Sequence, residues 1–279
     1  MLATGAQAIR LNFTGNAATQ AMSVNSLDDY AAFRNRLKPQ ARVLIIGAGL
    51  IGCEFANDLA ASGHAVQVVD PGAAPLASLL PAQVSAALRE SLEALQVRWH
   101  FGTLASSIDR VGDDHVVRFA NGQTVVVDVV LSAVGLRADT ALAQAAGLAT
   151  ERGIVVNAQL QTSAPHVYAL GDNTQYASAS AGMSRTLPYV MPIMTASKAL
   201  AQTLAGTPTD VQFALMPVAI KTPALPLVVA PPLPGTSGTW HEVEEGVWQF
   251  VDEASRVRGF VLTGAQTSRR AELAKRVTA

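Results

Sequence analysis

The sequence predicts an α/β protein built around a Rossmann-like unit of parallel strands joined by helices, followed by a small C-terminal α/β domain. Between residues 42 and 134, short apolar runs rich in β-branched residues alternate with amphipathic helical patterns. This alternation is typical of parallel strands joined by helices. After residue 206 the chain is proline-dense through Pro234, and strand-like stretches follow. We therefore expect a change of domain near residue 206.

The first element of the parallel unit is a helix that begins near Ser26. An acidic residue lies three positions after this serine, as in a helix N-terminal capping box. Tyr30, Phe33 and Leu37 then follow at helical spacing. Pro39 should stop the helix, because proline cannot continue the hydrogen-bonding pattern.

A strand, a helix and a second strand come next and form one βαβ unit. Residues 42–46 are a continuous apolar run, which predicts a strand buried on both faces. A helix is expected at 51–62, because Gly63 stands where a helix C-terminus favours glycine. Residues 65–69 form the second strand, which Asp70 and Pro71 close.

The rest of the chain continues with elements that are shorter and less regular. The hairpin in this part is indicated by Asn121-Gly122, a pair that favours a two-residue turn. We expect helices at 81–95, 140–146 and 188–204, the hairpin at 115–120 and 123–127, and strands at 97–101, 129–134, 154–156, 167–170, 218–220, 247–252 and 258–263.

A glycine motif joins the first strand of the βαβ unit to its helix. Gly47 permits the tight turn, Gly49 lets the backbone approach a pyrophosphate, and Gly52 allows the helix to pack closely on the strand. The N–H groups at the helix start favour the phosphates. Asp70, at the end of the second strand, is placed to accept hydrogen bonds from the ribose hydroxyls and to repel a 2′-phosphate. The sequence therefore predicts a Rossmann-like site for NAD, with NADH preferred over NADPH.

Two residues in the first turn of the same helix are less specific. Glu54 either stabilises the helix dipole or points toward the nicotinamide end of the site, and the sequence leaves both interpretations open. Cys53 is the only cysteine, and we interpret it as a small buried packing residue.

Composition excludes several classes of function. The formal net charge is −1 over 279 residues, so nothing in the overall charge indicates nucleic acid or an anionic membrane as a partner. No apolar run approaches the roughly 20 residues of a membrane-spanning helix, and the N-terminus does not resemble a signal peptide. The five histidines show no metal-binding spacing. A cytoplasmic protein is expected.

Further motifs make the chain resemble the FAD-dependent pyridine nucleotide-disulfide oxidoreductases, which bind FAD in one Rossmann-like domain and NAD(P)H in an inserted one. Gly171 and Asp172, in YALGDN, match the strand end that closes the family's FAD site. Thr4 and Gly5, in Ala-Thr-Gly, match the first exit from the FAD domain. Gly135, in Ala-Val-Gly, matches the strand end that closes the NAD domain. The resemblance implies an α/β fold with two Rossmann-like dinucleotide-binding domains, of which the FAD domain is incomplete in this sequence, and FAD and NAD as the cofactors.

The tail is similar to that of the rubredoxin–NAD reductases. The resemblance rests on Met-Pro-Ile-Met at 191–194 and Lys-Thr-Pro at 221–223. It implies electron transfer from NADH through FAD to rubredoxin or a similar small electron carrier, with Lys221 as a candidate for the flavin edge. Rubredoxins are acidic, so we expect a basic docking face that includes Arg185, Lys198 and Lys221.

The family begins with its own strand–GxGxxG–helix unit for the ADP half of FAD, and that unit is absent before Thr4. We therefore expect an incomplete FAD domain, short by on the order of 100 residues, with poor or no flavin affinity. Two rival functions remain. A flavin-free NAD dehydrogenase would leave the Thr-Gly and Gly-Asp motifs unexplained, and the other rival is a truncated NAD-binding remnant without reductase activity. The expected domains are a remnant of the FAD-binding domain at 1–22, the NAD-binding domain at 23–137, a second FAD-binding segment at 138–206 and the C-terminal domain at 207–279.

Overall fold

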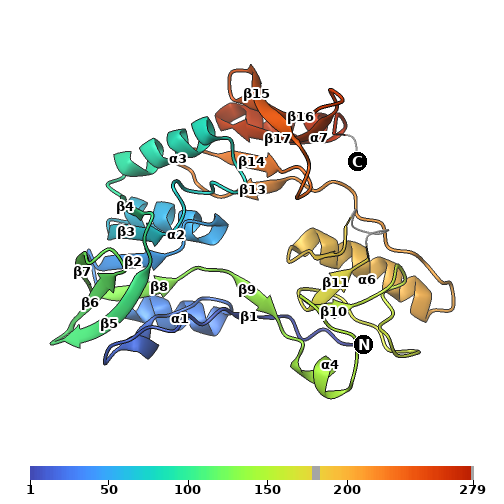
Figure 1. Ribbon diagram of the computed structural model, residues 1–279, viewed down its shortest axis with the longest axis horizontal. Coiled ribbons are helices and arrows are strands. Elements are labelled where there is room, and N and C mark those ends of the chain that lie inside the picture. The colour runs from blue at the N-terminus through green and yellow to red at the C-terminus, as the bar shows by residue number, and fades with distance from the viewer. Residues whose placement is uncertain (178–182, 278–279) are drawn as a thin grey trace.

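The computed structural model describes residues 1–177 and 183–277. The chain forms three lobes (Figure 1): a first lobe with α1 to α3, a second lobe with α4 and α6, and a C-terminal lobe. Strands β1 (Ala6–Ala8) and β9 (Leu136–Ala138) pair antiparallel and run between the first two lobes. The chain therefore crosses between these lobes twice, once in each direction.

A four-stranded sheet forms the centre of the first lobe, and all of its neighbouring strands are parallel. Their order is β4-β3-β2-β8, so the chain reverses its direction of progress across the sheet after β4. The strands are β2 (Arg42–Ile46), β3 (Ala65–Asp70), β4 (Arg98–Phe101) and β8 (Val129–Ser132). The predicted parallel βαβ arrangement is confirmed.

Helices cover one face of this sheet and a second, antiparallel sheet covers the other. The helices are α1 (Leu27–Arg36), α2 (Leu50–Ala61) and α3 (Ala82–Ala94). The second sheet consists of β5 (Ala105–Val111), β6 (Asp114–Phe119) and β7 (Thr124–Val127). Alternate residues of β2 point to opposite sides: Val43 and Ile45 pack with the helices, whereas Leu44 and Ile46 pack with the second sheet.

Local signals in the first lobe correspond closely to the observed elements. The side chain of Ser26 accepts a hydrogen bond from the Asp29 N–H (3.1 Å), which caps α1 as predicted. The hairpin of β6 and β7 is confirmed, with Gly122 in its turn at φ +88°. Strand β5 was not predicted; its centre, Ile108, is fully buried against the sheet.

The second lobe has less regular structure than the sequence predicts. Its elements are α4 (Ala141–Ala145), β10 (Ile154–Val155), β11 (Thr174–Tyr176), β12 (Arg185–Thr186) and α6 (Val190–Leu204), whereas the short helix η1 (Ala18–Gln20) packs in the first lobe beside β5. The predicted strand at 167–170 is wrong as a continuous element. Only isolated bridges occur there, from Tyr168 to Gln161 and from Ala169 to Leu2.

The C-terminal lobe is a five-stranded antiparallel sheet in the order β13-β14-β17-β16-β15. Its helices are short, so the lobe has much less helix than the α/β domain that we expected. The strands are β13 (Val218–Ile220), β14 (Leu227–Ala230), β15 (Gly238–Glu244), β16 (Val247–Asp252) and β17 (Val257–Thr263), followed by η2 (Gly264–Arg269) and α7 (Arg270–Ala274).

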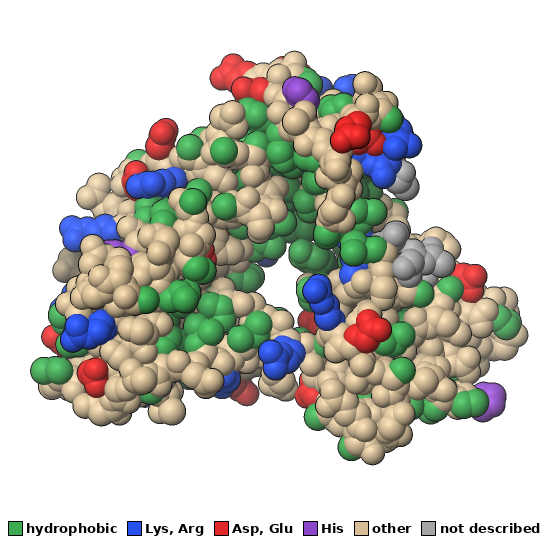
Figure 2. Space-filling view, viewed as in Figure 1, with side chains coloured by type: hydrophobic (Ala, Val, Ile, Leu, Met, Phe, Trp, Pro, Cys, Tyr) green, Lys and Arg blue, Asp and Glu red, His purple; other side chains and the backbone are tan. Residues whose placement is uncertain are grey.

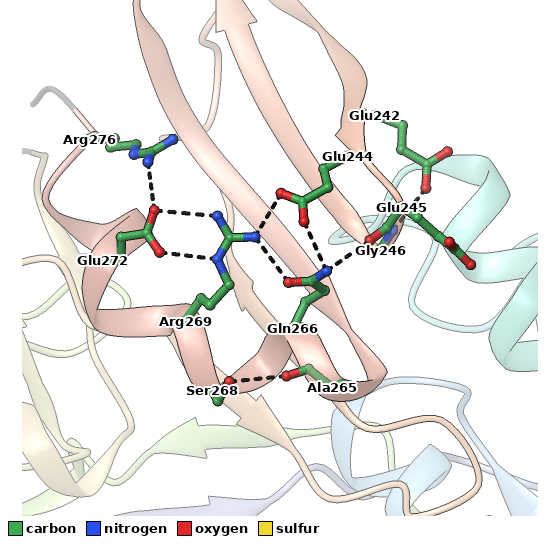
Figure 3. A network of polar contacts seen from close by, with 10 residues as sticks. All are labelled: Glu242, Glu244, Glu245, Gly246, Ala265, Gln266, Ser268, Arg269, Glu272 and Arg276. Atoms are coloured by element: carbon green, nitrogen blue, oxygen red, sulfur yellow. Dashed lines mark hydrogen bonds and ion pairs between the residues drawn. The ribbon is translucent and has the colours of Figure 1, made fainter.

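A network of charged side chains fastens the last helices to the β15–β16 hairpin (Figure 3). Arg269 donates to Glu244 (2.7 Å) and to Glu272 (3.0 Å), and Glu272 also pairs with Arg276 (2.5 Å). These side chains are partly exposed, so each pair contributes little to stability by itself. The network instead fixes the direction in which the helices leave the sheet.

The C-terminal sheet shares one hydrophobic core with the first lobe. Side chains of this sheet pack in the same cluster as Cys53, Ala56 and Leu59 of α2; they are Ile220, Leu227, Val229, Trp248 and Val261. The opposite face of the sheet packs against α7 through Phe260 and Leu273. The two lobes therefore form one packed body, although they are far apart in sequence.

Candidate functional site

The glycine loop after β2 has the geometry that a dinucleotide pyrophosphate requires. Gly47 has φ +107°, and a Cβ atom there would lie 2.8 Å from the carbonyl oxygen of Ala133. A Cβ atom on Gly52 would overlap the carbonyl oxygen of Gly47, so only glycine lets α2 approach the loop this closely. At Gly49, by contrast, a Cβ atom would meet nothing within 4 Å. The space beside Gly49 is thus open where a phosphate would approach.

Asp70 connects the end of β3 to this loop. One carboxylate oxygen accepts the Ala48 N–H (2.7 Å) and the other accepts the Gly72 N–H (2.6 Å). Each oxygen retains a further lone pair, because a carboxylate offers about four acceptor sites. The carboxylate is therefore held in place beside the glycine loop and can still accept hydrogen bonds from a ribose.

Glu54 has a contact that neither sequence interpretation included. Its carboxylate accepts the backbone N–H of Lys221 (2.8 Å), which lies in the loop after β13. One turn further along α2, the side-chain oxygen of Asn57 accepts the Ala224 N–H (3.0 Å) from the same loop. The structure thus brings the two predicted residues Glu54 and Lys221 together. Asn57 was missed, although a buried asparagine among apolar helix residues was a signal.

The Ala-Thr-Gly motif with Thr4 and Gly5 and the Gly-Asp motif at Gly171 and Asp172 meet in the second lobe. Thr4 accepts a hydrogen bond from the Asn173 side chain (3.1 Å) and donates one to the Asp139 carbonyl (2.7 Å). The Gly171 N–H donates to the hydroxyl of the fully buried Tyr176 (3.1 Å). These contacts place Thr4-Gly5 next to Gly171-Asp172, as the resemblance implied.

Asp172 has a carboxylate oxygen that is buried but has no hydrogen-bond partner among residues 1–177 and 183–277. Burial raises the pKa of this carboxyl above its ordinary value. An unpaired buried acceptor of this kind fits a ligand hydroxyl, and a ribityl chain offers several. The residues present are therefore compatible with the sugar-alcohol part of FAD.

Gly135 lies on the return crossing between the lobes and has φ +97°. Its carbonyl oxygen accepts the Ile9 N–H (3.1 Å), so it ties this crossing to the outward one near β1. Gly135 is not part of the glycine loop. Ala133, two residues earlier, donates its backbone N–H to the carbonyl oxygen of Ile46 (2.8 Å), the residue directly before that loop.

The three candidate docking cations differ in their surroundings. Lys198 on α6 and Lys221 are exposed. Arg185 on β12 is half-buried, and burial lowers the pKa of its guanidinium. Its Nε atom has no partner in the described part of the chain. The first turn of α6, close to Arg185, exposes apolar side chains, with Val190 73% and Met191 60% accessible.

In Figure 2 the three lobes surround an opening, and hydrophobic side chains gather on surfaces that face it. Several Lys and Arg side chains lie near the same opening. In residues 1–177 and 183–277, no helix is both long and apolar enough to cross a membrane. Over the same residues, no group of three or more His, Cys, Asp or Glu side chains could hold a metal ion.

Comparisons with known proteins agree with this geometry. Residues 1–203 match the family described as pyridine nucleotide-disulphide oxidoreductase, and residues 210–277 match the one described as rubredoxin binding C-terminal domain. The rubredoxin-NAD(+) reductase of Acinetobacter baylyi is 44% identical over 95% of this chain and 68% of its own length. That of Alcanivorax borkumensis is 42% identical over 100% of this chain and 72% of its own length.

The fold also matches a solved structure. The crystal structure of a ferredoxin reductase from Rhodopseudomonas palustris superposes with a TM-score of 0.86 at 26% identity, covering 99% of this chain and 70% of that one. A covalent complex of putidaredoxin reductase with putidaredoxin matches with the same TM-score of 0.86 at 22% identity, over 98% of this chain and 68% of that one. The predicted α/β fold class is confirmed.

Proposed function

The chain belongs to the pyridine nucleotide-disulphide oxidoreductase family, and from this premise we propose that it oxidises NADH and passes the electrons through FAD to rubredoxin or a similar small carrier. It is an NADH-dependent flavoprotein reductase with the cofactors FAD and NAD. One observation carries the proposal. The domain that matches rubredoxin-binding domains shares its core with the helix that begins at the dinucleotide loop.

We propose that NADH binds on the glycine loop and the start of α2. Gly47 and Gly52 shape the loop, and Gly49 leaves the space that the pyrophosphate occupies. Asp70 accepts hydrogen bonds from the adenosine ribose with the lone pairs that its two backbone contacts leave free. A negative charge at this point favours NADH over NADPH.

FAD is held in the second lobe, by the Thr4-Gly5 and Gly171-Asp172 motifs that meet there. Asp172 contacts the ribityl chain with its unpaired oxygen, while Thr4, Gly5 and Gly171 form the surrounding backbone. Gly135 fixes the crossing segment between the two cofactor sites.

FAD, when bound, accepts hydride from NADH and releases electrons singly to a one-electron carrier. The protein's part is to align the two cofactors and to seat the carrier. Glu54 contributes to alignment by holding the Lys221 backbone beside the nucleotide-binding helix. The Lys221 side chain, which is exposed, is then available to the flavin edge or to the carrier.

The carrier is expected to dock by charge rather than by a large buried area, as is usual for redox encounters. We propose Lys198 and Lys221 as the main docking cations, with a smaller contribution from the half-buried Arg185. With all three changed to alanine, the fall of kcat/KM for rubredoxin with ionic strength should become shallower, because screening acts over about 8–10 Å. Ferricyanide reduction is the control, and an unaltered salt slope for rubredoxin would place the docking face elsewhere.

We assign the domains as 1–22 and 138–206 for FAD, 23–137 for NAD and 207–279 for the carrier. The double crossing by β1 and β9 supports the first three boundaries, and the match that begins at residue 210 supports the last. We place the protein in the cytoplasm, because a single free, buried cysteine suits a reducing compartment.

The deciding experiment supplies the purified chain with NADH, oxidised rubredoxin and a large excess of FAD, because the incomplete FAD domain is expected to bind flavin weakly, and it follows both NADH oxidation and rubredoxin reduction. We expect the two to proceed together, with two rubredoxins reduced for each NADH. Binding of NADH without any rubredoxin reduction would instead favour the rival function, an NAD-binding protein that has no reductase activity.

A further inference from the structure

We infer that Asn57 is a positioning residue: it fixes the Lys221 loop on the nucleotide-binding helix and so sets the place of Lys221 relative to the NADH site. This inference rests on the proposed function for the meaning of that placement. The contact itself stands on the geometry described below.

Two side chains on α2 accept hydrogen bonds from two backbone N–H groups of the loop after β13. Glu54 and Asn57 are three residues apart, so their side chains lie on the same face of the helix. Their partners, the N–H groups of Lys221 and Ala224, are also three residues apart, at distances of 2.8 and 3.0 Å. The helix therefore holds the loop at two points and fixes both its position and its direction.

The loop itself is rigid between these two points. The hydroxyl of Thr222 donates to the Leu225 carbonyl (2.8 Å), and the Leu225 N–H donates to the Thr222 carbonyl (2.9 Å). Thr222 is only 1% exposed. A tightly closed turn of this kind moves as a unit, so displacing Ala224 also displaces Lys221.

Asn57 is the stronger of the two holding points, because it is buried. Its residue is 2% exposed, whereas the Glu54 contact is open to solvent. Water can replace the Glu54 carboxylate more readily than the Asn57 oxygen, because Asn57 lies in the core and its contact with Ala224 is partly buried. The Asn57 amide is also fully oriented, since its nitrogen donates to the Asp58 carboxylate (3.1 Å).

Nothing else about α2 accounts for an asparagine at this position. The other buried residues of the helix are Gly52, Cys53, Ala56 and Leu59. Asparagine is unfavourable in a helix interior and in an apolar core. The loop contact supplies the reason for its presence.

The shared core alone would not set the place of Lys221. Hydrophobic contact between α2 and the C-terminal sheet is non-directional, so it holds the two together but allows sliding. The Asn57 hydrogen bond is directional and adds the missing constraint. Lys221 is thereby kept one turn from the helix start, where the dinucleotide phosphates bind.

The test uses three variants of the full chain. Asn57→Leu removes the acceptor at similar volume. The double variant Asn57→Asp with Asp58→Asn restores an acceptor for the Ala224 N–H and a donor at residue 58. Asn16→Leu is the matched control, because Asn16 also accepts a backbone N–H from a distant segment, that of Arg110 (2.7 Å), but far from α2 in the sequence.

Four measurements follow the Lys221 loop, NADH binding, turnover with ferricyanide and the interaction with rubredoxin separately. We expect Asn57→Leu to raise the hydrogen-exchange rate of the Lys221 backbone N–H about five- to tenfold, as expected from the loss of one net hydrogen bond that holds the loop. The KM for rubredoxin should rise by a similar factor, while the NADH dissociation constant and the kcat with ferricyanide stay within about twofold. The double variant should restore both changed quantities, and Asn16→Leu should alter neither.

A further measurement uses the unaltered chain. The Ala224 N–H of the unaltered chain should exchange with solvent slowly, because it is bonded to a buried acceptor. Rapid exchange of this amide, or an unchanged exchange rate of the Lys221 N–H in a folded Asn57→Leu protein, would overturn the inference. Both readouts concern the loop itself, so they remain decisive even if the chain fails to reduce rubredoxin and the proposed function is wrong.

Discussion

Changing Asp70 to asparagine should narrow the preference for NADH over NADPH. Asparagine has nearly the same shape as aspartate, but it has one acceptor oxygen and no charge. In the structure both carboxylate oxygens are in use, one with the Ala48 N–H and one with the Gly72 N–H, at 2.7 and 2.6 Å. The asparagine amide can satisfy only one of these donors. Its –NH₂ group then faces the other donor, and the ribose loses an ionised acceptor.

Two free-energy contributions change the affinities for NADH and NADPH, a lost hydrogen bond and a lost charge repulsion. Hydrogen bonds to charged groups contribute about 1.5–3 kcal/mol each, so the loss of one weakens NADH binding by at least about tenfold. For NADPH the same loss is offset, because the repulsion between a carboxylate and a 2′-phosphate disappears. Two unit charges about 4 Å apart repel by about 1–4 kcal/mol between bulk water and a protein surface. The hydrogen-bond loss is common to both nucleotides, so the ratio of the two affinities should narrow by the lost repulsion alone, about fivefold or more.

Isothermal titration with each nucleotide, at low and at physiological ionic strength, measures this ratio directly. Asp252→Asn is the matched control. Asp252 also accepts two backbone N–H groups, those of Ala254 and Arg256 at 2.9 Å each, but it lies in the C-terminal lobe. The control should lose some stability and keep its nucleotide preference. If Asp70→Asn keeps the preference as well, Asp70 is not the ribose ligand and the reasoning fails.

Three further predictions concern the first lobe. Gly52→Ala should destabilise the fold by about 1–3 kcal/mol in urea titration, because its Cβ atom overlaps the loop carbonyl; Gly49→Ala should fold normally yet bind NADH poorly, since its Cβ atom meets only open space. Equal stability of the two variants would contradict the packing argument. Burial, with smaller contributions from nearby acids, raises the pKa of the Cys53 thiol to about 12 from 9.0. Stability should therefore fall above about pH 9, where only the unfolded thiol loses its proton, by about 1.4 kcal/mol per pH unit from this group; an identical pH slope for Cys53→Ala would refute this. Ser26→Ala removes the cap of α1 and should cost about 1 kcal/mol in thermal or urea unfolding, without a change in NADH affinity.

Local signals in the sequence determined the first lobe. The strand at Arg42–Ile46 and the helix after it were predicted to within one residue, because burial on both faces and helix capping leave marks on adjacent residues. The same holds for the glycine loop, where close packing demands residues without a side chain. The family motifs at Thr4-Gly5 and Gly171-Asp172 were also visible, since each is a short contiguous pattern.

Tertiary structure alone decided how distant segments meet. Residues 167–170 resemble a strand in composition, but each forms at most an isolated bridge with a segment far away or across a short loop. Strand β5 was missed, because its pairing with β6 leaves only a weak alternation in the sequence.

The contact of Glu54 and Asn57 with the Lys221 loop spans 167 residues, and no local pattern encodes it. A helix side chain that accepts a backbone N–H places no demand on which residue supplies that N–H. The partner is therefore invisible in the sequence. Only the packing of the C-terminal sheet against α2 brings the loop within reach and turns two ordinary helix residues into the connection between the nucleotide site and the carrier-binding domain.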